Sequence, residues 1–208
     1  MEKFNALEKR IRNPRPGEFL FFVEPLPTGE FFATAEFKRR DGYFEYHVGA
    51  AMVVDVFNKW DNIVSSASIP SRTAASGCHH FGRTLWWNDD RNRFGWVRTD
   101  TDPAGDMKMI RTFVAESLDF CQSHLTTIEG IRDSLWHGTH NEFGFPRPPT
   151  GVSQWYLYVA LELGMFDEVI EQVDKKIDSL KLSQESLRPF YVRLRETALR
   201  MRDEAGNE

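Results

Sequence analysis

The sequence predicts an α+β fold: an antiparallel β-meander of about five strands packed by helices, followed by a C-terminal helical hairpin and a terminal helix. Apolar and polar residues alternate from Gly29 to Phe57 on both sides of Asp41-Gly42, which is the pattern of a β-hairpin. From Pro103 onward, apolar residues recur at three- and four-residue steps, which is typical of amphipathic helices. This change of period indicates that strands dominate the first half of the chain and helices the second.

The hairpin also predicts its own register. A type I′ turn at Asp41 and Gly42 determines which residues face each other across the two strands. The facing apolar pairs are then Phe37 with Tyr46, Ala35 with Val48 and Phe31 with Met52. Lys38 faces Glu45 on the other side, and a slip of one residue would break both patterns. We therefore expect a half-buried sheet with one apolar face.

Further elements are expected around this hairpin. A helix over residues 2–12 is ended by the prolines that follow it, and Glu18 to Val23 forms the first strand. The alternation after the turn continues to Val56, and the serine-rich residues 65–77 predict a loop. A second hairpin is predicted from Phe81 to Thr99.

The helices begin at recognisable signals. Asp102-Pro103 begins a helix whose apolar face is formed by Met107, Ile110, Val114, Leu118 and Cys121. Thr126 and Glu129 have the spacing of a capping box and begin a second helix that continues through Trp136. Both helices are expected to pack on the sheet.

The chain is expected to divide near its proline-rich segment. Residues 138–152 predict a loop between an α+β domain over residues 1–137 and a helical subdomain over residues 153–208. In that subdomain Gly164 ends one helix and Asp167 caps the next. A last helix, from about Ser186 to Glu204, accepts Pro189 in its first turn.

Composition limits the classes of function. The 208 residues are 41% hydrophobic, which suits a globular core, and no run approaches the roughly 18 apolar residues of a membrane span. The net charge of −5 argues against a nucleic-acid binder, which needs a basic surface. The start of the chain lacks a secretory pattern and there are two cysteines, so the expected location is cytoplasmic.

Catalytic motifs are weak in this sequence. It contains neither a phosphate-binding GxxxxGK[ST] loop nor a GxGxxG fingerprint, so no nucleotide cofactor is expected. The residues that could bind zinc are Cys78, His80, Cys121 and His124, of which the last two lie three residues apart on one helix. They support a zinc-dependent hydrolase as the alternative function. The sequence leaves open whether the protein is an enzyme and favours a non-catalytic role with no cofactor.

Aromatic residues predict a binding surface. Trp86 and Trp87 are neighbours on a predicted strand, so their side chains point to opposite faces and one of them is expected to leave the core. Tryptophan beside aspartate and arginine has the composition of a protein-binding hot spot. The predicted partner-binding residues are Trp60, Trp87, Asp89, Asp90, Arg91 and Trp96.

Three segments carry a family resemblance: Phe37 to Phe44, Leu85 to Trp87, and Leu125 to Ile131. Over about residues 1–180 the chain resembles the bacterial family called domain of unknown function 4304. That resemblance implies an α+β domain with no established activity and no known catalytic residues to carry over to this chain. In size and charge the chain is also similar to the single-domain immunity proteins encoded beside bacterial toxins.

The expected function is therefore protein binding. We expect a bacterial immunity protein whose acidic, aromatic surface occludes the active site of a basic toxin, with neither nucleic acid nor membrane as partner. A scaffold subunit of a larger bacterial assembly is the remaining alternative.

Overall fold

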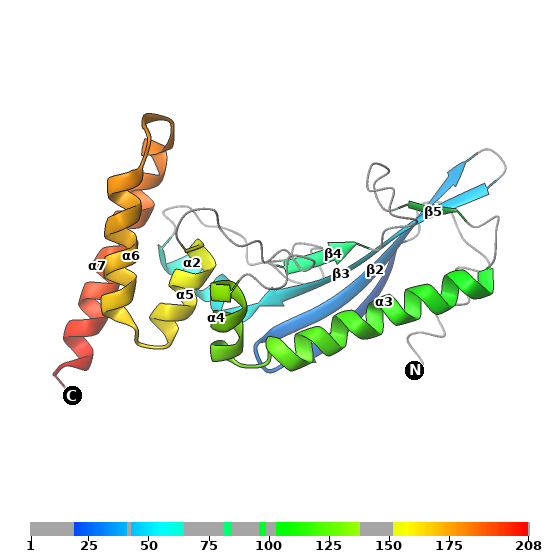
Figure 1. The fold of residues 1–208 in the computed structure, drawn as a ribbon, viewed down its shortest axis with the longest axis horizontal. Coiled ribbons are helices and arrows are strands. Elements are labelled where there is room, and N and C mark those ends of the chain that lie inside the picture. The colour runs from blue at the N-terminus through cyan, green and yellow to red at the C-terminus, as the bar shows by residue number, and fades with distance from the viewer. Residues whose placement is uncertain are drawn as a thin grey trace. The chain divides into compact units, whose positions relative to one another are not determined.

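The computed structural model describes residues 19–40, 43–64, 81–84, 96–98, 103–137 and 152–207. These residues belong to two compact units (Figure 1). The first contains the described residues up to Val53 and those from Phe81 to Ser123, and the second contains Val54 to Val64 and the described residues from His124 onward. The division groups residues 55–64 and 128–137 with the C-terminal helices, whereas the sequence prediction placed both in the first domain.

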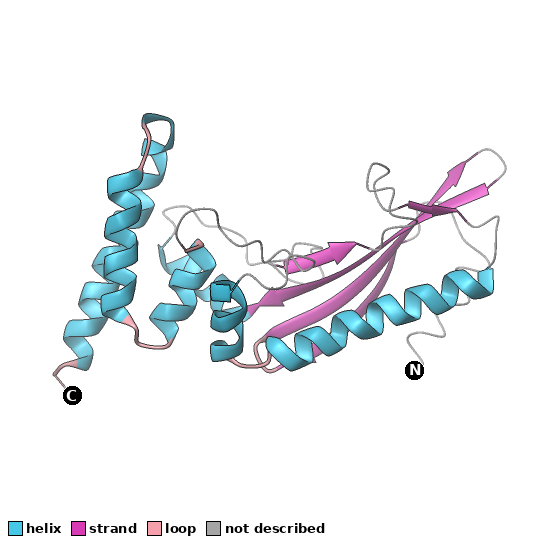
Figure 2. Cartoon of the chain, in the orientation of Figure 1, coloured by secondary structure: helices cyan, strands magenta, loops and turns pink. Residues whose placement is uncertain are grey.

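The first unit contains an antiparallel sheet, so the predicted α+β class is confirmed (Figure 2). Its strands are β1 (Phe19–Leu26), β2 (Gly29–Arg40), β3 (Tyr43–Val54), β4 (Phe81–Thr84) and β5 (Trp96–Arg98). The order is β1-β2-β3-β4, and β5 also pairs with β3. β1 runs antiparallel to β2 with Val23 opposite Phe32, and it continues three residues beyond the predicted end at Val23.

The predicted hairpin corresponds to β2 and β3, which are hydrogen-bonded neighbours. Each strand has 12 residues. β2 ends directly before residues 41 and 42 and β3 begins directly after them, and these two residues lie outside the described residues. The predicted register sets Phe32 opposite Ala51. Phe32, Ala51 and Val53 form one buried cluster to which Val23 adds, which agrees with that register.

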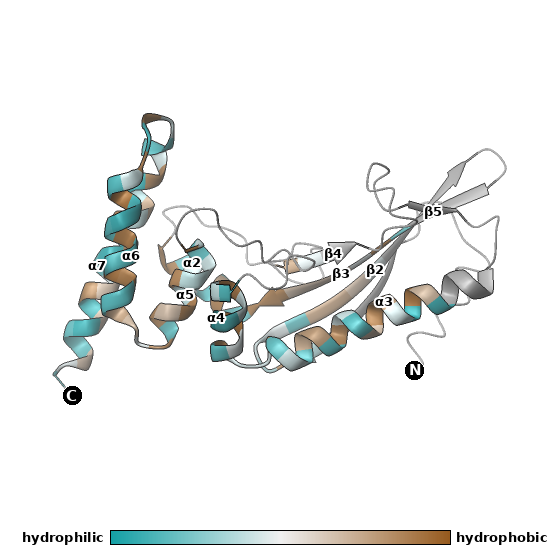
Figure 3. Ribbon diagram, in the orientation of Figure 1, coloured by the Kyte–Doolittle hydropathy of each residue, from teal (hydrophilic) through white to brown (hydrophobic). Residues whose placement is uncertain are grey.

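The end of β3 is buried on both faces rather than on one. Every residue from Ala50 to Val54 is buried, although successive side chains point to opposite sides of the sheet. Figure 3 shows this end of β3 as hydrophobic. The half-buried pattern expected for the whole hairpin therefore fails here, because small and β-branched residues replace the polar half of the alternation.

The described residues of the predicted second hairpin, β4 and β5, do not pair with each other. β4 pairs with Gly49–Met52 and β5 with Glu45–His47, and both run antiparallel to β3. They therefore point in the same direction, whereas the two strands of a hairpin are antiparallel to each other. Because β2 occupies the other edge of β3, β4 and β5 form one interrupted edge strand. Residues 85–95, between its two pieces, lie outside the described residues.

The long helix α3 (Pro103–His124) completes the first unit up to Ser123 and runs along the sheet in Figure 1. It begins at Pro103, as predicted. Ile110, Val114 and Cys121 are buried as expected, and Phe113 and Ser117 widen the buried face. The Ser117 hydroxyl donates a 2.5 Å hydrogen bond to the Phe113 carbonyl, which satisfies this polar group inside the core.

The second unit begins with α2 (Asp55–Val64), which the sequence prediction missed. The predicted strand ran to Val56, yet Val56, Phe57, Trp60 and Val64 also have helical spacing, and all four are buried. α2 contacts α5 and α7, and the Phe57 ring stacks on Trp155 with 4.8 Å between ring centroids. Tertiary packing within this unit thus favours the helix.

The remaining helices are α4 (Ile128–His137), α5 (Gln154–Glu162), α6 (Phe166–Ser179), the 3-10 helix η3 (Leu182–Leu187) and α7 (Arg188–Ala205). The helical hairpin of α5 and α6 and the terminal helix with Pro189 in its first turn confirm the prediction. Gly164, between α5 and α6, has a φ of 71°, which favours glycine.

Asp167 does not cap α6 as predicted. The cap position is Met165, and Asp167 lies in the first turn, where its carboxylate pairs with Arg202 at 3.1 Å. An acidic side chain is favourable there because the helix N-terminus carries partial positive charge. Among the helices described, none has the length and apolar character needed to cross a bilayer.

Candidate functional site

Trp60 is not part of an exposed surface, contrary to the prediction. It lies on the buried face of α2, with 2% of its surface exposed. Its indole Nε1 donates a 3.1 Å hydrogen bond to Oε2 of Glu162 on α5, and the same oxygen lies 2.6 Å from Nζ of Lys59. Trp60 therefore has a structural role between α2 and α5.

The other predicted partner-binding residues are not tested. Trp87, Asp89, Asp90 and Arg91 lie outside the described residues, and for Trp96 only the backbone in β5 is described. This set stays a prediction.

The predicted zinc ligands are not brought together where the structure describes them. Cys121 is buried, whereas His124, three residues later on α3, is exposed. Cys78 and His80 lie outside the described residues. Within the described part of the chain, no group of three or more His, Cys, Asp or Glu residues is placed to hold a metal ion.

An exposed tryptophan lies elsewhere, at the end of α4. Half of the Trp136 surface is exposed, which is unusual for so large an apolar side chain. Its ring packs on Tyr156 of α5, with ring centroids 5.2 Å apart and an interplanar angle of 38°. Tyr156 is itself buried, so one side of the indole rests on a fixed aromatic ring while the other faces solvent.

The support beneath Trp136 is held by hydrogen bonds. The Tyr156 hydroxyl donates a 2.5 Å hydrogen bond to Oε1 of Glu168 on α6. Burial and this bond raise the pKa of Tyr156 far above its ordinary value, so the phenol stays protonated and acts as a donor. The backbone N–H of Tyr156 donates to the Ser153 hydroxyl, which caps α5. The ring below Trp136 is therefore fixed from both ends.

Charged residues precede Trp136 on the same helix. Arg132, one turn before Trp136, donates to the Asp133 carboxylate at 2.7 Å, and its Nη1 lies 3.9 Å from the Met165 sulfur. The hydrogen bond to Asp133 raises the pKa of Arg132, which keeps the guanidinium charged. We define the Trp136 surface as Arg132, Asp133, Trp136, Met165 and Glu168.

The composition of this surface suits binding rather than catalysis. Tryptophan, arginine and methionine are enriched at protein interfaces. Its titratable groups are already paired with one another, and the Tyr156 phenol is not available as a base. The sequence contains a signal for this exposed residue: Ile131 and Leu135 form the apolar face of α4, and Trp136 falls outside that face.

Comparisons of the chain with protein-family models, with curated proteins and with solved structures find no significant match. The resemblance to domain of unknown function 4304 therefore stays a prediction.

Proposed function

We propose that the protein is a non-catalytic protein-binding module and that the Trp136 surface contacts the partner. The observation that carries this proposal is the half-exposed indole of Trp136, held on the buried ring of Tyr156. A fixed aromatic side chain loses little conformational entropy when a partner covers it. Such residues dominate the binding free energy of many interfaces, and truncating one typically costs about 2 kcal/mol or more.

We further propose that the partner is a cationic toxin enzyme and that the protein acts in the cytoplasm as its immunity protein. The chain has a net charge of −5. Asp133 lies three residues before Trp136 on α4, and Glu168 accepts the hydrogen bond from Tyr156, on whose ring Trp136 packs. An acidic surface around a central aromatic residue accelerates association with a basic partner, while the aromatic contact limits dissociation. This is the kind of surface that the sequence predicted, in a different part of the chain.

The test is affinity capture of the tagged full chain from its native host, with the Trp136→Ala variant in parallel. Ile63→Ala is the matched control, since Ile63 is an apolar residue of similar exposure on α2. We expect one stoichiometric companion that binds the wild type and Ile63→Ala and is lost, or weakened by roughly thirtyfold, with Trp136→Ala. A companion that Trp136→Ala retains at full affinity would refute the role of this surface.

The immunity role needs a second measurement on the purified companion. We expect it to be an enzyme whose activity the wild-type protein inhibits and the Trp136→Ala variant does not. If the companion keeps its full enzymatic activity when the protein is bound, or has no enzymatic activity, the protein is instead a scaffold subunit.

A further inference from the structure

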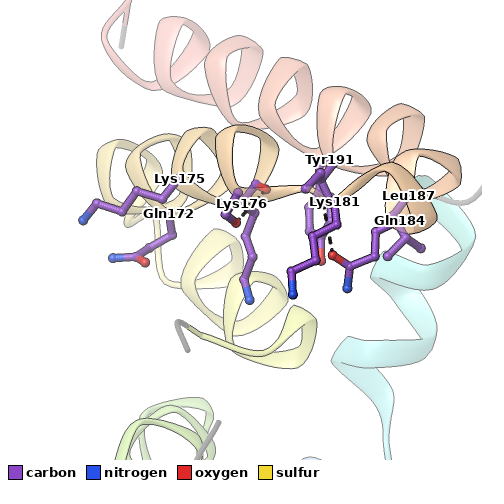
Figure 4. Close-up of a pocket in the computed structure, with 9 residues that line it drawn as sticks. Gln172, Lys175, Lys176, Lys181, Gln184, Leu187 and Tyr191 are labelled. Atoms are coloured by element: carbon purple, nitrogen blue, oxygen red, sulfur yellow. Dashed lines mark hydrogen bonds between the residues drawn. The ribbon is translucent and has the colours of Figure 1, made fainter. Parts of the chain in front are cut away.

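A recess of about 610 Å³ lies at the other end of the helical hairpin, between the C-terminal end of α6, η3 and the start of α7. Figure 4 shows the side chains of Lys175, Lys176, Lys181 and Gln184 pointing to the same side of the helices, with Leu187 and Tyr191 beside them. Three of its nine lining residues are lysines and none of the nine is acidic. The recess is thus locally basic in a chain of net charge −5.

Two carboxylates at this end of the hairpin pair with basic groups. Glu171 pairs with Lys175 at 2.5 Å on the exposed face of α6. Glu185 of η3 is directed to Arg188 at 2.7 Å, outside the lining of the recess. At Lys181 the backbone N–H, not the ammonium group, is bonded to the Gln184 side chain, at 3.4 Å. Exposed pairs of this kind are weak and exchange readily for a better anionic partner.

Exposed apolar side chains either line the recess or directly follow one of its lining residues in sequence. Leu182, in the first turn of η3, is 93% exposed, and Leu187, which lines the recess, is 45% exposed. Val192 of α7 is exposed as well. Several exposed aliphatic side chains on one short segment cost solvation free energy, and such patches commonly mark contact sites. The neighbouring lysines favour a partner that also carries negative charge.

We propose that this recess binds an acidic, amphipathic segment of a partner protein, with its carboxylates on Lys176 and Lys181 and its apolar side chains on Leu182 and Leu187. The positive lining selects negative charge, and the exposed leucines select a ligand that also has an apolar face. A small phosphate compound would use the lysines and leave the leucines exposed. The proposal does not depend on the Trp136 surface, whose residues belong to α4 and to the start of α6 and do not line the recess.

The probe is a short fluorescein-labelled peptide in which Glu and Leu recur at helical spacing, with a second peptide in which each Glu is replaced by Gln. Fluorescence anisotropy with the full chain should show binding of the Glu peptide that weakens with added salt. We expect the Lys176→Glu/Lys181→Glu variant to lower this affinity at least about tenfold. Lys108→Glu/Arg200→Glu, the same charge change at exposed positions that do not line the recess, should have little effect.

Leu182→Ser tests the apolar half of the site at a position where folding is not at risk, and Ile63→Ser is its matched control. We expect weaker binding of the Glu peptide to Leu182→Ser and unchanged binding to Ile63→Ser and to Trp136→Ala. Equal binding of the Gln peptide, or full affinity of the lysine variant, would overturn the proposal. So would sedimentation showing that a second copy covers the recess, or binding of pyrophosphate in place of the peptide.

Discussion

The hydroxyl of Tyr158 donates a 2.9 Å hydrogen bond to Oδ1 of Asp61, joining α5 to α2 across 97 residues of sequence. Both side chains are buried. A carboxylate removed from water needs hydrogen-bond donors to offset its lost hydration. This bond therefore helps to hold α2 on the helical hairpin, in the same interface where Trp60 contacts Glu162.

Replacing Tyr158 by phenylalanine should destabilise the protein. The variant removes a donor to a buried carboxylate without opening a large cavity, and we expect the free energy of unfolding to fall by about 1–3 kcal/mol. Urea denaturation followed by circular dichroism measures the change. Tyr191→Phe is the control. Tyr191 is half-buried, and its hydroxyl forms no hydrogen bond with any of the described residues.

A double-mutant cycle with Asp61→Asn separates this bond from general effects of the substitution. If the two side chains interact as described, the combined loss is smaller than the sum of the single losses. Additive losses would show that the bond contributes nothing to stability.

The same residue should make stability depend on pH in the alkaline range. Burial and the negative charge of Asp61 raise the pKa of Tyr158 above its ordinary value of 10.0. As pH increases past about 10, the unfolded chain loses this proton while the folded chain keeps it. The unfolded state then binds fewer protons, so the free energy of unfolding falls as pH rises.

Urea denaturation of the wild type and of Tyr158→Phe between about pH 9 and pH 11 measures this dependence. We expect the wild type to lose stability more steeply than the variant, so that the difference between them narrows with rising pH. Parallel curves would contradict the raised pKa of Tyr158.

The helices after residue 152 could be predicted because their signals are local. Apolar spacing, the positive-φ Gly164 and Pro189 in a first turn act within a few residues of sequence. The pairing of β4 and β5 with the same strand could not be predicted, because it depends on contacts far away in sequence. The aromatic and β-branched residues there predict strands but do not specify their partner.

The candidate site was misplaced for a related reason. Val54 and Val56 continue the alternation of β3, so the predicted strand runs into the residues that form α2. The helical spacing that buries Trp60 competes with this alternation and determines the structure. The sequence predicts a helix through Trp136 but does not indicate how much of this side chain is exposed, which the structure shows to be half. The spacing of apolar residues identifies the buried face of a helix, but it does not show how far a large side chain beside that face is exposed.

Gly130 should not tolerate a side chain, although it lies inside α4. A Cβ there would lie 2.4 Å from the His124 carbonyl oxygen, which is backbone and cannot easily move. Gly→Ala inside a helix usually gains up to about 1 kcal/mol, whereas a clash in packed structure costs about 1–3 kcal/mol. We therefore expect Gly130→Ala to lower the thermal midpoint.

Gly206→Ala is the matched control for this substitution. Its nearest neighbour would be the Arg202 carbonyl oxygen at 3.5 Å, an ordinary contact at the end of α7. We expect a change within about 0.5 kcal/mol. A Gly130→Ala protein as stable as this control would show that the chain between α3 and α4 relaxes to accept the methyl group.

The start of α4 allows the predicted and observed caps to be compared directly. The capping-box spacing predicts Thr126 as the cap, with Glu129 as its partner. In the structure, α4 begins at Ile128, and the Gly130 N–H donates a 3.0 Å hydrogen bond to the hydroxyl of Thr127. The cap therefore lies one residue later than predicted.

Thr127→Ala should consequently cost about 0.5–2 kcal/mol of stability, and Thr127→Ser, which keeps the hydroxyl, should restore most of it. We expect Thr126→Ala to cost less than Thr127→Ala, measured by urea denaturation under the same conditions. The reverse order would place the cap at Thr126, as the spacing alone predicts. Since Trp136 lies at the other end of this short helix, fraying at its start should also weaken capture of the partner by the Trp136 surface.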